Sequence, residues 1–159
     1  MIDKATNDRI NKVHPKLRDE LREIVNYIET LGIRIRITQG LRTIEEQNAL
    51  YAQGRTKPGK IVTNAKGGTS FHNYGLAVDF CLLHKDGSVS FSINEDTDGD
   101  HIKDWDEVVN AFKKYGWEHG DRGYFDNPHF QKVYGLTPSK CLQKIALNQV
   151  DAQGYILLP

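Results

Sequence analysis

One short stretch, residues 70–80, restricts the fold of this chain more than any other. It reads Ser-Phe-His-Asn-Tyr-Gly-Leu-Ala-Val-Asp-Phe, with His72 and Asp79 seven positions apart and Gly75 between them. In a fully extended strand, at about 3.3 Å per residue, these two polar residues would be roughly 23 Å apart. A common site therefore requires the chain to turn back, and glycine tolerates the backbone angles of such a turn best.

The residues after the glycine predict a buried strand over 76–83. Apolar side chains fall on both faces of this strand, and Asp79 is its single charged residue. Ala77 and Cys81 share its face and are small, which leaves room beside the carboxylate. A buried carboxylate is costly unless it is paired or bound to a metal. The alternative to a metal site is that Asp79 pairs with an arginine and that His72 is an ordinary loop histidine.

A second acid and a second histidine lie in the segment Asp126-Asn-Pro-His129-Phe. Pro128 biases the residue before it toward an extended conformation, so a turn or strand entry, and not a helix, should hold both side chains. A plain surface turn is the alternative, because the segment is good turn chemistry by itself. Two imidazoles and two carboxylates are enough for three zinc ligands and one general base, with one coordination position left for water.

Together these motifs resemble those of zinc peptidases of the D-alanyl-D-alanine carboxypeptidase type. The pattern Ser-x-His-x-x-Gly-x-Ala-x-Asp, followed by Asp-x-Pro-His-Phe, is most similar to that of the L-alanyl-D-glutamate endopeptidases of bacterial cell-wall turnover and phage endolysins. Residues 38–43, 45–55 and 115–118 carry the same resemblance, which extends over about residues 10 to 132. The resemblance implies that three residues bind zinc: His72, Asp79 and His129.

The resemblance also implies roles for residues around the metal. Asp126 would be the general base, Arg42 would stabilise the oxyanion and contact the substrate, and Ser70 would help to place the substrate. A guanidinium just past a strand end suits a substrate carboxylate or a developing oxyanion. The alternative is that Arg42 is a solvated loop arginine.

The chain departs from the family pattern after Trp117. Where the family usually carries a Gly-Gly-Asp-Trp type run, this sequence has Glu118-His119-Gly-Asp-Arg122. The aromatic residue after the aspartate is lost, which puts substrate contacts there in doubt. Glu118 and His119 could also compete as an acid and ligand pair, although adjacent residues on a strand point to opposite faces.

The whole pattern predicts an α+β fold, with a small antiparallel sheet that bears the zinc site and helices packed on one side. The resemblance implies that this is a D,D-peptidase or hedgehog-like arrangement. Periodicity and capping signals predict helices at about 15–31, 43–54, 104–115 and 137–147, and strands at 33–38, 76–83 and 89–93. Residues 55–69 should form a long loop beside the metal that contributes to substrate binding.

An acidic segment before the third predicted helix has the spacing of a calcium loop. Counted from Asp96, the ligand positions 1, 3, 5, 7, 9 and 12 fall on Asp96, Asp98, Asp100, the Ile102 carbonyl, Asp104 and Glu107. The match is imperfect, because His101 replaces the usual glycine at position 6 and no helix precedes the loop. The alternative is that Asp104 is a helix N-cap and that Glu107 completes a capping box.

Length and composition bound the remaining possibilities. A chain of 159 residues predicts a single domain over 1–159, without a separate cell-wall-binding module. Its 21 basic and 21 acidic residues balance, which points away from nucleic acid. Cys81 and Cys141 are too few for a disulfide framework, so a free thiol is expected at Cys81.

The N-terminal sequence contains no apolar run of the kind found in signal peptides or transmembrane segments. We therefore expect no membrane insertion, and a monomeric enzyme that acts on the cell wall after lysis or release, as a phage or prophage endolysin would.

The predicted function is zinc-dependent hydrolysis of an amide bond in the peptidoglycan stem peptide. The bond between L-alanine and D-glutamate is what the resemblance implies, because spacing alone selects no bond. One alternative is a D,D-carboxypeptidase or dipeptidase that acts on D-alanyl-D-alanine termini with the same chemistry. Another is a non-catalytic wall-binding domain with a relic metal site, although such a module has no use for a general base.

Overall fold

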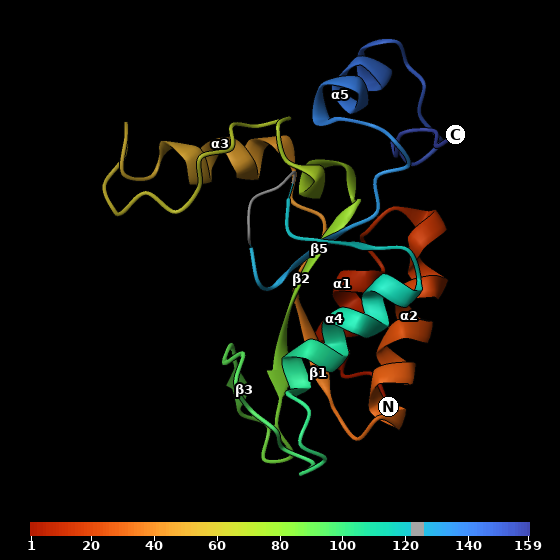
Figure 1. Cartoon of the computed structure of the whole chain (residues 1–159). Coiled ribbons are helices and arrows are strands. Elements are labelled where there is room, and N and C mark those ends of the chain that lie inside the picture. Colours follow the sequence, from red (N-terminus) through yellow and green to blue (C-terminus); the bar gives the residue numbers. More distant parts are fainter. Residues whose placement is uncertain (122–125) are drawn as a thin grey trace.

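The computed structural model of the chain describes residues 1–121 and 126–159, and these form an α+β fold (Figure 1). The described α-helices are α1 (Lys4–Ile10), α2 (Pro15–Thr30), α3 (Ile44–Ala52), α4 (Asp104–Lys114) and α5 (Pro138–Ala146), and one 3-10 helix, η1, spans Phe71–Tyr74. The described strands are β1 (Ile35–Gln39), β2 (Ala77–Leu83), β3 (Val89–Ser90), β4 (Glu118–His119) and β5 (His129–Gln131).

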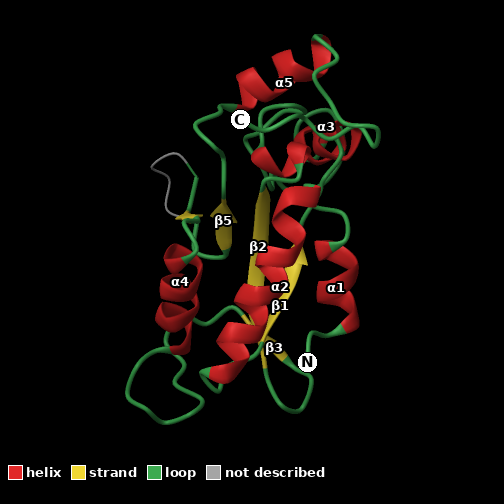
Figure 2. Ribbon diagram, turned by 90° about the vertical axis from the view of Figure 1, so that its right-hand side faces the viewer, coloured by secondary structure: helices red, strands yellow, loops and turns green. Residues whose placement is uncertain are grey.

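The strands form one antiparallel sheet around β2. Its order is β1-β2-β5-β4, and β3 pairs with the far end of β2. Helix α2 lies in front of this sheet in Figure 2, with α4 to its left beside β5 and α1 to its right beside β1. Helix α3 projects from the opposite side (Figure 1). The predicted fold class, a small antiparallel sheet with helices packed on one side, is confirmed.

Aromatic side chains fill the core between the sheet and α4. The rings of Phe112 and Phe130 stack with centroids 4.1 Å apart and an interplanar angle of 4°, and Phe80 lies 4.3 Å from Trp105. Helix α2 closes the core with fully buried residues at helical spacing: Leu17, Leu21, Ile24 and Ile28. Because Phe80 and Phe130 are anchored in this core, the opposite faces of β2 and β5 are held in place.

Helix α1 covers the free edge of β1 and was not predicted from the sequence. The Thr6 hydroxyl accepts the N–H of Ile37 at 3.0 Å, and Arg9 donates to the Ile37 carbonyl at 2.9 Å. An exposed edge strand is a template for pairing with other chains, so this cover has a protective effect. The helix has seven residues, of which only Thr6 and Ile10 are buried, and it therefore lacks the apolar periodicity that reveals α2.

Several local predictions match the structure. The capping box of Thr43 and Glu46 is formed at the start of α3, and Thr137 caps α5 with Pro138 at its first position. Both cysteines are buried free thiols. None of the helices among the described residues combines the length and apolar character that a bilayer-spanning segment needs.

One local prediction was wrong, and one alternative that the sequence left open does not hold. The strand predicted over 89–93 is only two residues long, because the following residues turn away toward the acidic loop. The alternative role of Asp104, as the N-cap of α4, is absent: the N-cap is Lys103, without a side-chain capping bond. The carboxylate of Asp104 accepts instead from the N–H of Thr97, at 3.1 Å.

Gly75 turns the chain from η1 into β2. Its φ of 70° is in the left-handed region, and its carbonyl accepts the N–H of His14 at 3.0 Å. A Cβ atom at Gly75 would lie 2.5 Å from the His14 nitrogen, a separation that side-chain carbons essentially never adopt. Both the backbone angle and the close approach therefore require glycine here.

We expect Gly75→Ala to destabilise the protein more than Gly87→Ala. Gly87 also has a left-handed φ, of 87°, but nothing lies within 4 Å of its added Cβ. The control should cost about 1–2 kcal/mol for the backbone angle alone. Gly75→Ala should cost at least about 1–3 kcal/mol more, because it also clashes with backbone. Urea unfolding monitored by circular dichroism measures the free energy of unfolding of both variants. Equal losses of stability would contradict the close approach of Gly75 to the His14 backbone.

Candidate metal centre

Three side chains that are far apart in the sequence meet beside the start of β2. Oδ1 of Asp79 lies 3.1 Å from Nδ1 of His129 and 3.3 Å from Nε2 of His72. The two imidazole centroids are 5.0 Å apart, and both rings are buried. The structure thus gathers the three residues that the motif suggests as zinc ligands, and among the described residues these two histidines are the side chains that bond to the Asp79 carboxylate.

The sheet register places two of these residues. Asp79 on β2 is directly opposite His129 on β5 in the antiparallel ladder. Opposed residues project from the same face with Cβ atoms about 4.5–5.5 Å apart, which suits two ligands of one ion. The N–H of His129 bonds to the Asp126 carbonyl at 3.1 Å, so a tight turn leads into β5, as Pro128 predicts.

Helix η1 places the third residue. The Ser70 hydroxyl caps this short helix by accepting the N–H of His72 at 3.2 Å. The His72 carbonyl in turn accepts the N–H of Arg42 at 3.0 Å. The turn at Gly75 then brings the chain back, so that His72 faces Asp79 across the start of β2.

Each imidazole has its outer nitrogen bonded to a carbonyl oxygen. Nδ1 of His72 lies 2.8 Å from the carbonyl of Gly40, and Nε2 of His129 lies 2.9 Å from Oε1 of Gln131. Because these oxygens only accept, the two outer nitrogens donate. The inner nitrogens hydrogen-bond to Asp79, and once they lose that proton they can offer their lone pairs to a metal, as in metal sites whose histidines are oriented by a second layer of bonds.

The donor set fits zinc. Two atoms bound at 2.0–2.1 Å to a tetrahedral zinc are about 3.3–3.4 Å apart. The two Asp79 separations of 3.1 and 3.3 Å are close to that value, and all three ligand atoms lie within 4.8 Å of one another. Two imidazoles and one carboxylate leave one position open for water or substrate, which is the pattern of catalytic zinc sites.

The charges in this cluster are strongly coupled. Burial alone would raise the pKa of Asp79, but hydrogen bonds from His129 and His72 outweigh it and hold that pKa well below its usual range. Burial lowers the pKa of His129, while the bond to Asp79 raises it more, so the net shift is upward. The carboxylate therefore stays charged at neutral pH and is available as a metal ligand.

The cluster opens into a polar cleft with a volume of about 380 Å³. Besides the three residues of the cluster, polar side chains line it: Gln39, Arg42, Thr63, Ser70, Asp121 and Asp126. A larger and more apolar hollow of about 470 Å³ lies between α3 and the C-terminal segment, but its lining contains no histidine. The chemistry of the lining, and not the size of the hollow, therefore identifies the candidate site.

The other predicted site residues line the same cleft. Nη1 of Arg42 donates to Gln47 at 3.0 Å and Nη2 donates to Gln39 at 3.4 Å, which fixes the guanidinium plane. Partial desolvation, and then the negative charge of Asp79, raise the pKa of Asp126, whose side chain is exposed. Ser70 is buried, and its hydroxyl caps η1 by accepting the N–H of His72, so its role in placing the substrate stays a prediction.

One residue of the site, Gln131, was missed by the sequence analysis. It is 1% exposed, and its amide Nε2 donates to Oε2 of Glu118 at 3.2 Å. That bond turns the amide oxygen toward His129, which is two positions earlier on the same strand face. The two-residue spacing of His129 and Gln131 was visible in the sequence, but the bond between Gln131 and Glu118 on β4 was not.

The competing reading of Glu118 and His119 as an acid and ligand pair is wrong. Glu118 orients Gln131, and the ring of His119 stacks on Phe130 with centroids 4.9 Å apart. Nε2 of His119 also lies 2.7 Å from the carbonyl of Asn127, so this residue supports the turn before β5. Arg122, at which the family's aromatic residue is replaced, lies outside the described residues.

Comparison with known families decides the class of protein that carries this site. Residues 10–131 match the family model described as VanY, D-alanyl-D-alanine carboxypeptidase. The chain belongs to this family. Peptidases of the VanY family are zinc-dependent, in agreement with the His-Asp-His cluster, and the resemblance inferred from the sequence motifs is confirmed.

Individual proteins extend this comparison. The chain is 42% identical, over 123 residues, to the peptidoglycan L-alanyl-D-glutamate endopeptidase CwlK of Bacillus subtilis (strain 168). The matched residues cover 76% of this chain and 74% of that protein. It resembles the solved structure of the Serratia marcescens L-Ala D-Glu endopeptidase ChiX, with a TM-score of 0.57 and 20% identity, over 82% of this chain and 88% of that one.

A further solved structure with the same fold is the vancomycin resistance D,D-dipeptidase VanXYg. Its TM-score is 0.55 at 24% identity, and the match covers 84% of this chain and 59% of that one. At this level of identity, both solved structures support the VanY-type fold and not a particular substrate.

We expect Gln131→Leu to weaken zinc binding by about 10–100-fold, because the Nε2–H of His129 loses its acceptor when the opposite nitrogen binds the metal. Competition with a chromophoric chelator measures this change. In NMR spectra of the zinc-loaded protein, the slowly exchanging Nε2–H signal of His129 should be lost, while the Nδ1–H signal of His72 stays as an internal control. Unchanged affinity would contradict the orienting role of Gln131.

Proposed function

We propose that this chain is a zinc-dependent peptidoglycan peptidase that hydrolyses the bond between L-alanine and D-glutamate in the stem peptide. The observation that carries the proposal is the buried set of His72, Asp79 and His129, which opens into a cleft also lined by Asp126 and Arg42. The choice of bond is supported by 42% identity to a protein named as an endopeptidase for that bond, over about three quarters of both chains.

In this proposal Nε2 of His72, the carboxylate of Asp79 and Nδ1 of His129 hold the zinc ion. When bound, zinc supplies Lewis-acid activation of a water molecule and of the scissile carbonyl. Gly40 and Gln131 keep the two imidazoles in the required orientation through the bonds to their outer nitrogens.

Asp126 is the proposed general base. It would accept a proton from the attacking water and return that proton to the leaving amine. A base works best when its pKa is closer to the working pH, and desolvation together with the charge of Asp79 raises the pKa of Asp126 in that direction. Its exposed position at the cleft leaves it accessible to both water and substrate.

Arg42 is the proposed oxyanion partner. Two of its five N–H donors are used by Gln47 and Gln39, which leaves donors for a substrate oxygen. Because the guanidinium is already fixed, little reorganisation is required as negative charge develops on the carbonyl oxygen.

We expect Asp126→Ala to retain zinc and to lose at least about 100-fold in the rate of peptidoglycan hydrolysis, the scale of general-base catalysis. Mass spectrometry of purified peptidoglycan digested with the zinc-loaded protein measures the rate of hydrolysis and identifies the bond that is cleaved. New N-terminal D-glutamate supports the proposal, whereas loss of terminal D-alanine would indicate a carboxypeptidase with the same site. No cleavage by the zinc-bound wild type would favour a non-catalytic wall-binding domain.

We also propose that the acidic loop before α4 binds structural calcium. Asp96 accepts the N–H groups of Gly99 and His101, at 2.8 and 3.0 Å, and these two residues have φ values of 76° and 72°. His101 therefore adopts the left-handed conformation that position 6 of a calcium loop requires. Oxygens of Asp96, Asp98 and Asp104 lie within 4.8 Å of one another, as do those of Asp98, Asp100 and Glu107.

Glu107 is the proposed last ligand of this loop. Desolvation, followed by the charges of the four nearby aspartates, raises the pKa of Glu107 to about 7. Its Oε2 is buried and has no hydrogen-bond partner among the described residues. A divalent cation would satisfy this oxygen and relieve the repulsion among the carboxylates.

We expect about 1 mM calcium to raise the melting temperature of the zinc-saturated protein by roughly 5 °C. A shift of this size is expected when the free calcium concentration is about 100 times the Kd of one site. Glu107→Gln should remove most of this shift, because it deletes one ligand charge. Asp106→Asn is the matched control, since it changes the neighbouring charge outside the set. A calcium shift that survives Glu107→Gln would contradict the proposed site, as would no shift in the wild type.

A further inference from the structure

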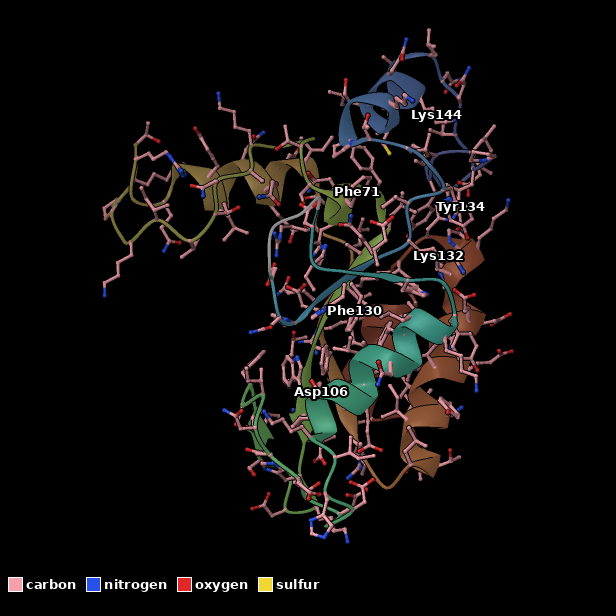
Figure 3. All side chains as sticks on the ribbon, viewed as in Figure 1. Phe71, Asp106, Phe130, Lys132, Tyr134 and Lys144 are labelled. Carbon is pink, nitrogen blue, oxygen red and sulfur yellow. The ribbon has the colours of Figure 1, made fainter. Side chains whose placement is uncertain are left out.

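Residues 53–69, here called the basic loop, run back along α3 and form with it an arm that stands away from the body of the protein (Figure 1). Figure 3 shows the side chains at the far end of this arm standing clear of the rest of the molecule. Helix α3 itself has only one buried residue, Gln47. The arm therefore contributes little to the core, and its position calls for a functional reason.

The charge of the basic loop is one-sided. It contains Arg55, Lys57, Lys60 and Lys66 and no acidic residue, so its formal charge is +4. Because the whole chain has a formal charge of zero, the remaining residues carry −4. The ion pairs found in the described part of the chain lie elsewhere, as between Glu20 and Lys132, which is labelled in Figure 3. The positive charge is thus concentrated on the basic loop, while α3 adds two acidic residues at its start, Glu45 and Glu46.

The loop is fixed to α3 by polar bonds. Gln47 donates to the Ala65 carbonyl at 2.8 Å, and Asn48 accepts the N–H of Gly67 at 2.9 Å. Arg55 donates to the Thr63 carbonyl at 3.0 Å, and its guanidinium lies 3.9 Å from the ring centroid of Tyr51. Arg55 therefore has a structural role. Three exposed lysines remain, Lys57, Lys60 and Lys66, of which Lys66 has its ammonium 5.5 Å from the centroid of the same Tyr51 ring.

The basic loop also continues a wall of the candidate cleft. Val62, Thr63 and Ala65 line the cleft together with the metal cluster. Ile61 and Val62 are 56% and 57% exposed, so this wall offers two apolar side chains next to Lys60 in the sequence, and Lys66 directly follows Ala65. A chain molecule that extends out of the cleft along this wall would meet both exposed apolar side chains and cations.

We propose that the basic loop is a docking surface for the peptidoglycan strand, and that its lysines bind carboxylates of stem peptides beyond the one being cleaved. The proposal rests on the proposed function, because the cleft defines where the strand begins. Stem peptides carry free carboxylates and alanine methyl groups, which complement the ammonium groups and the apolar pair. Single exposed ion pairs contribute little, but several along one polymer act together and are weakened by salt.

Sedimentation with insoluble peptidoglycan tests the proposal. The peptidoglycan is stripped of phosphate-containing polymers, and every protein carries Asp126→Ala so that the wall is not digested. The combined substitution Lys57→Gln, Lys60→Gln and Lys66→Gln should weaken binding about tenfold at about 50 mM salt, and the difference should shrink at about 500 mM. The matched control substitutes three exposed lysines elsewhere, Lys16, Lys85 and Lys113, and should bind within twofold of the parent.

Three results would overturn the proposal: equal binding of both triple variants and the parent, a tenfold loss that persists when the wall carboxylates are amidated, or a loss seen only on walls that retain phosphate polymers. Failure of the proposed function would look different. In that case the zinc-loaded wild type would not cleave a short soluble stem peptide, while the sedimentation result would still report on the basic loop.

Discussion

The carboxylate of Asp79 is the group on which the rest of this structure depends. It lies in the central strand of the sheet, where the neighbouring side chains are apolar and an unpaired charge would be unstable. Bonds from His72 and His129 keep it charged, and each histidine comes from a different element. The turn at Gly75, the register of β2 and β5 and the cap on η1 all serve to complete this one contact. The candidate metal centre is therefore built into the sheet.

Strand β5 joins the core to the site through its alternating faces. Phe130 points into the core and stacks on Phe112, while His129 and Gln131 point to the site. A ligand held between two anchored neighbours has little freedom to move. Such preorganisation is important at a metal centre, because a ligand displaced by a fraction of an ångström alters the coordination geometry.

The sequence predicted those parts of the fold that depend on local patterns. Apolar periodicity revealed α2, and turn and capping residues revealed the starts of α3 and α5. Helix α1 was missed because its main role is to pair with the backbone of Ile37, which no periodicity reports. The alternative role of Asp104 as an N-cap does not hold for a similar reason, since its carboxylate accepts a bond across the loop from Thr97.

For the candidate site, the sequence suggested the metal ligands but not the residues that orient them. The motif suggested His72, Asp79 and His129 as ligands, but spacing alone left an arginine pair or a surface turn open. The orienting role of Gln131 depends on its pairing with β4, and the course of the basic loop depends on polar bonds from Gln47 and Asn48. Contacts of this kind become visible only when the elements are placed in space.

The pairing of Asp79 with His129 has a consequence for how the protein matures. These residues are separated by 50 positions, so their strands can meet only after a long loop has closed. A slip of one residue would turn His129 into the core and replace it with an aromatic or a proline. The ion can therefore recognise only a chain whose sheet is already in register. A metal held by these three residues would therefore bind the folded chain, since the unfolded chain lacks the preformed site.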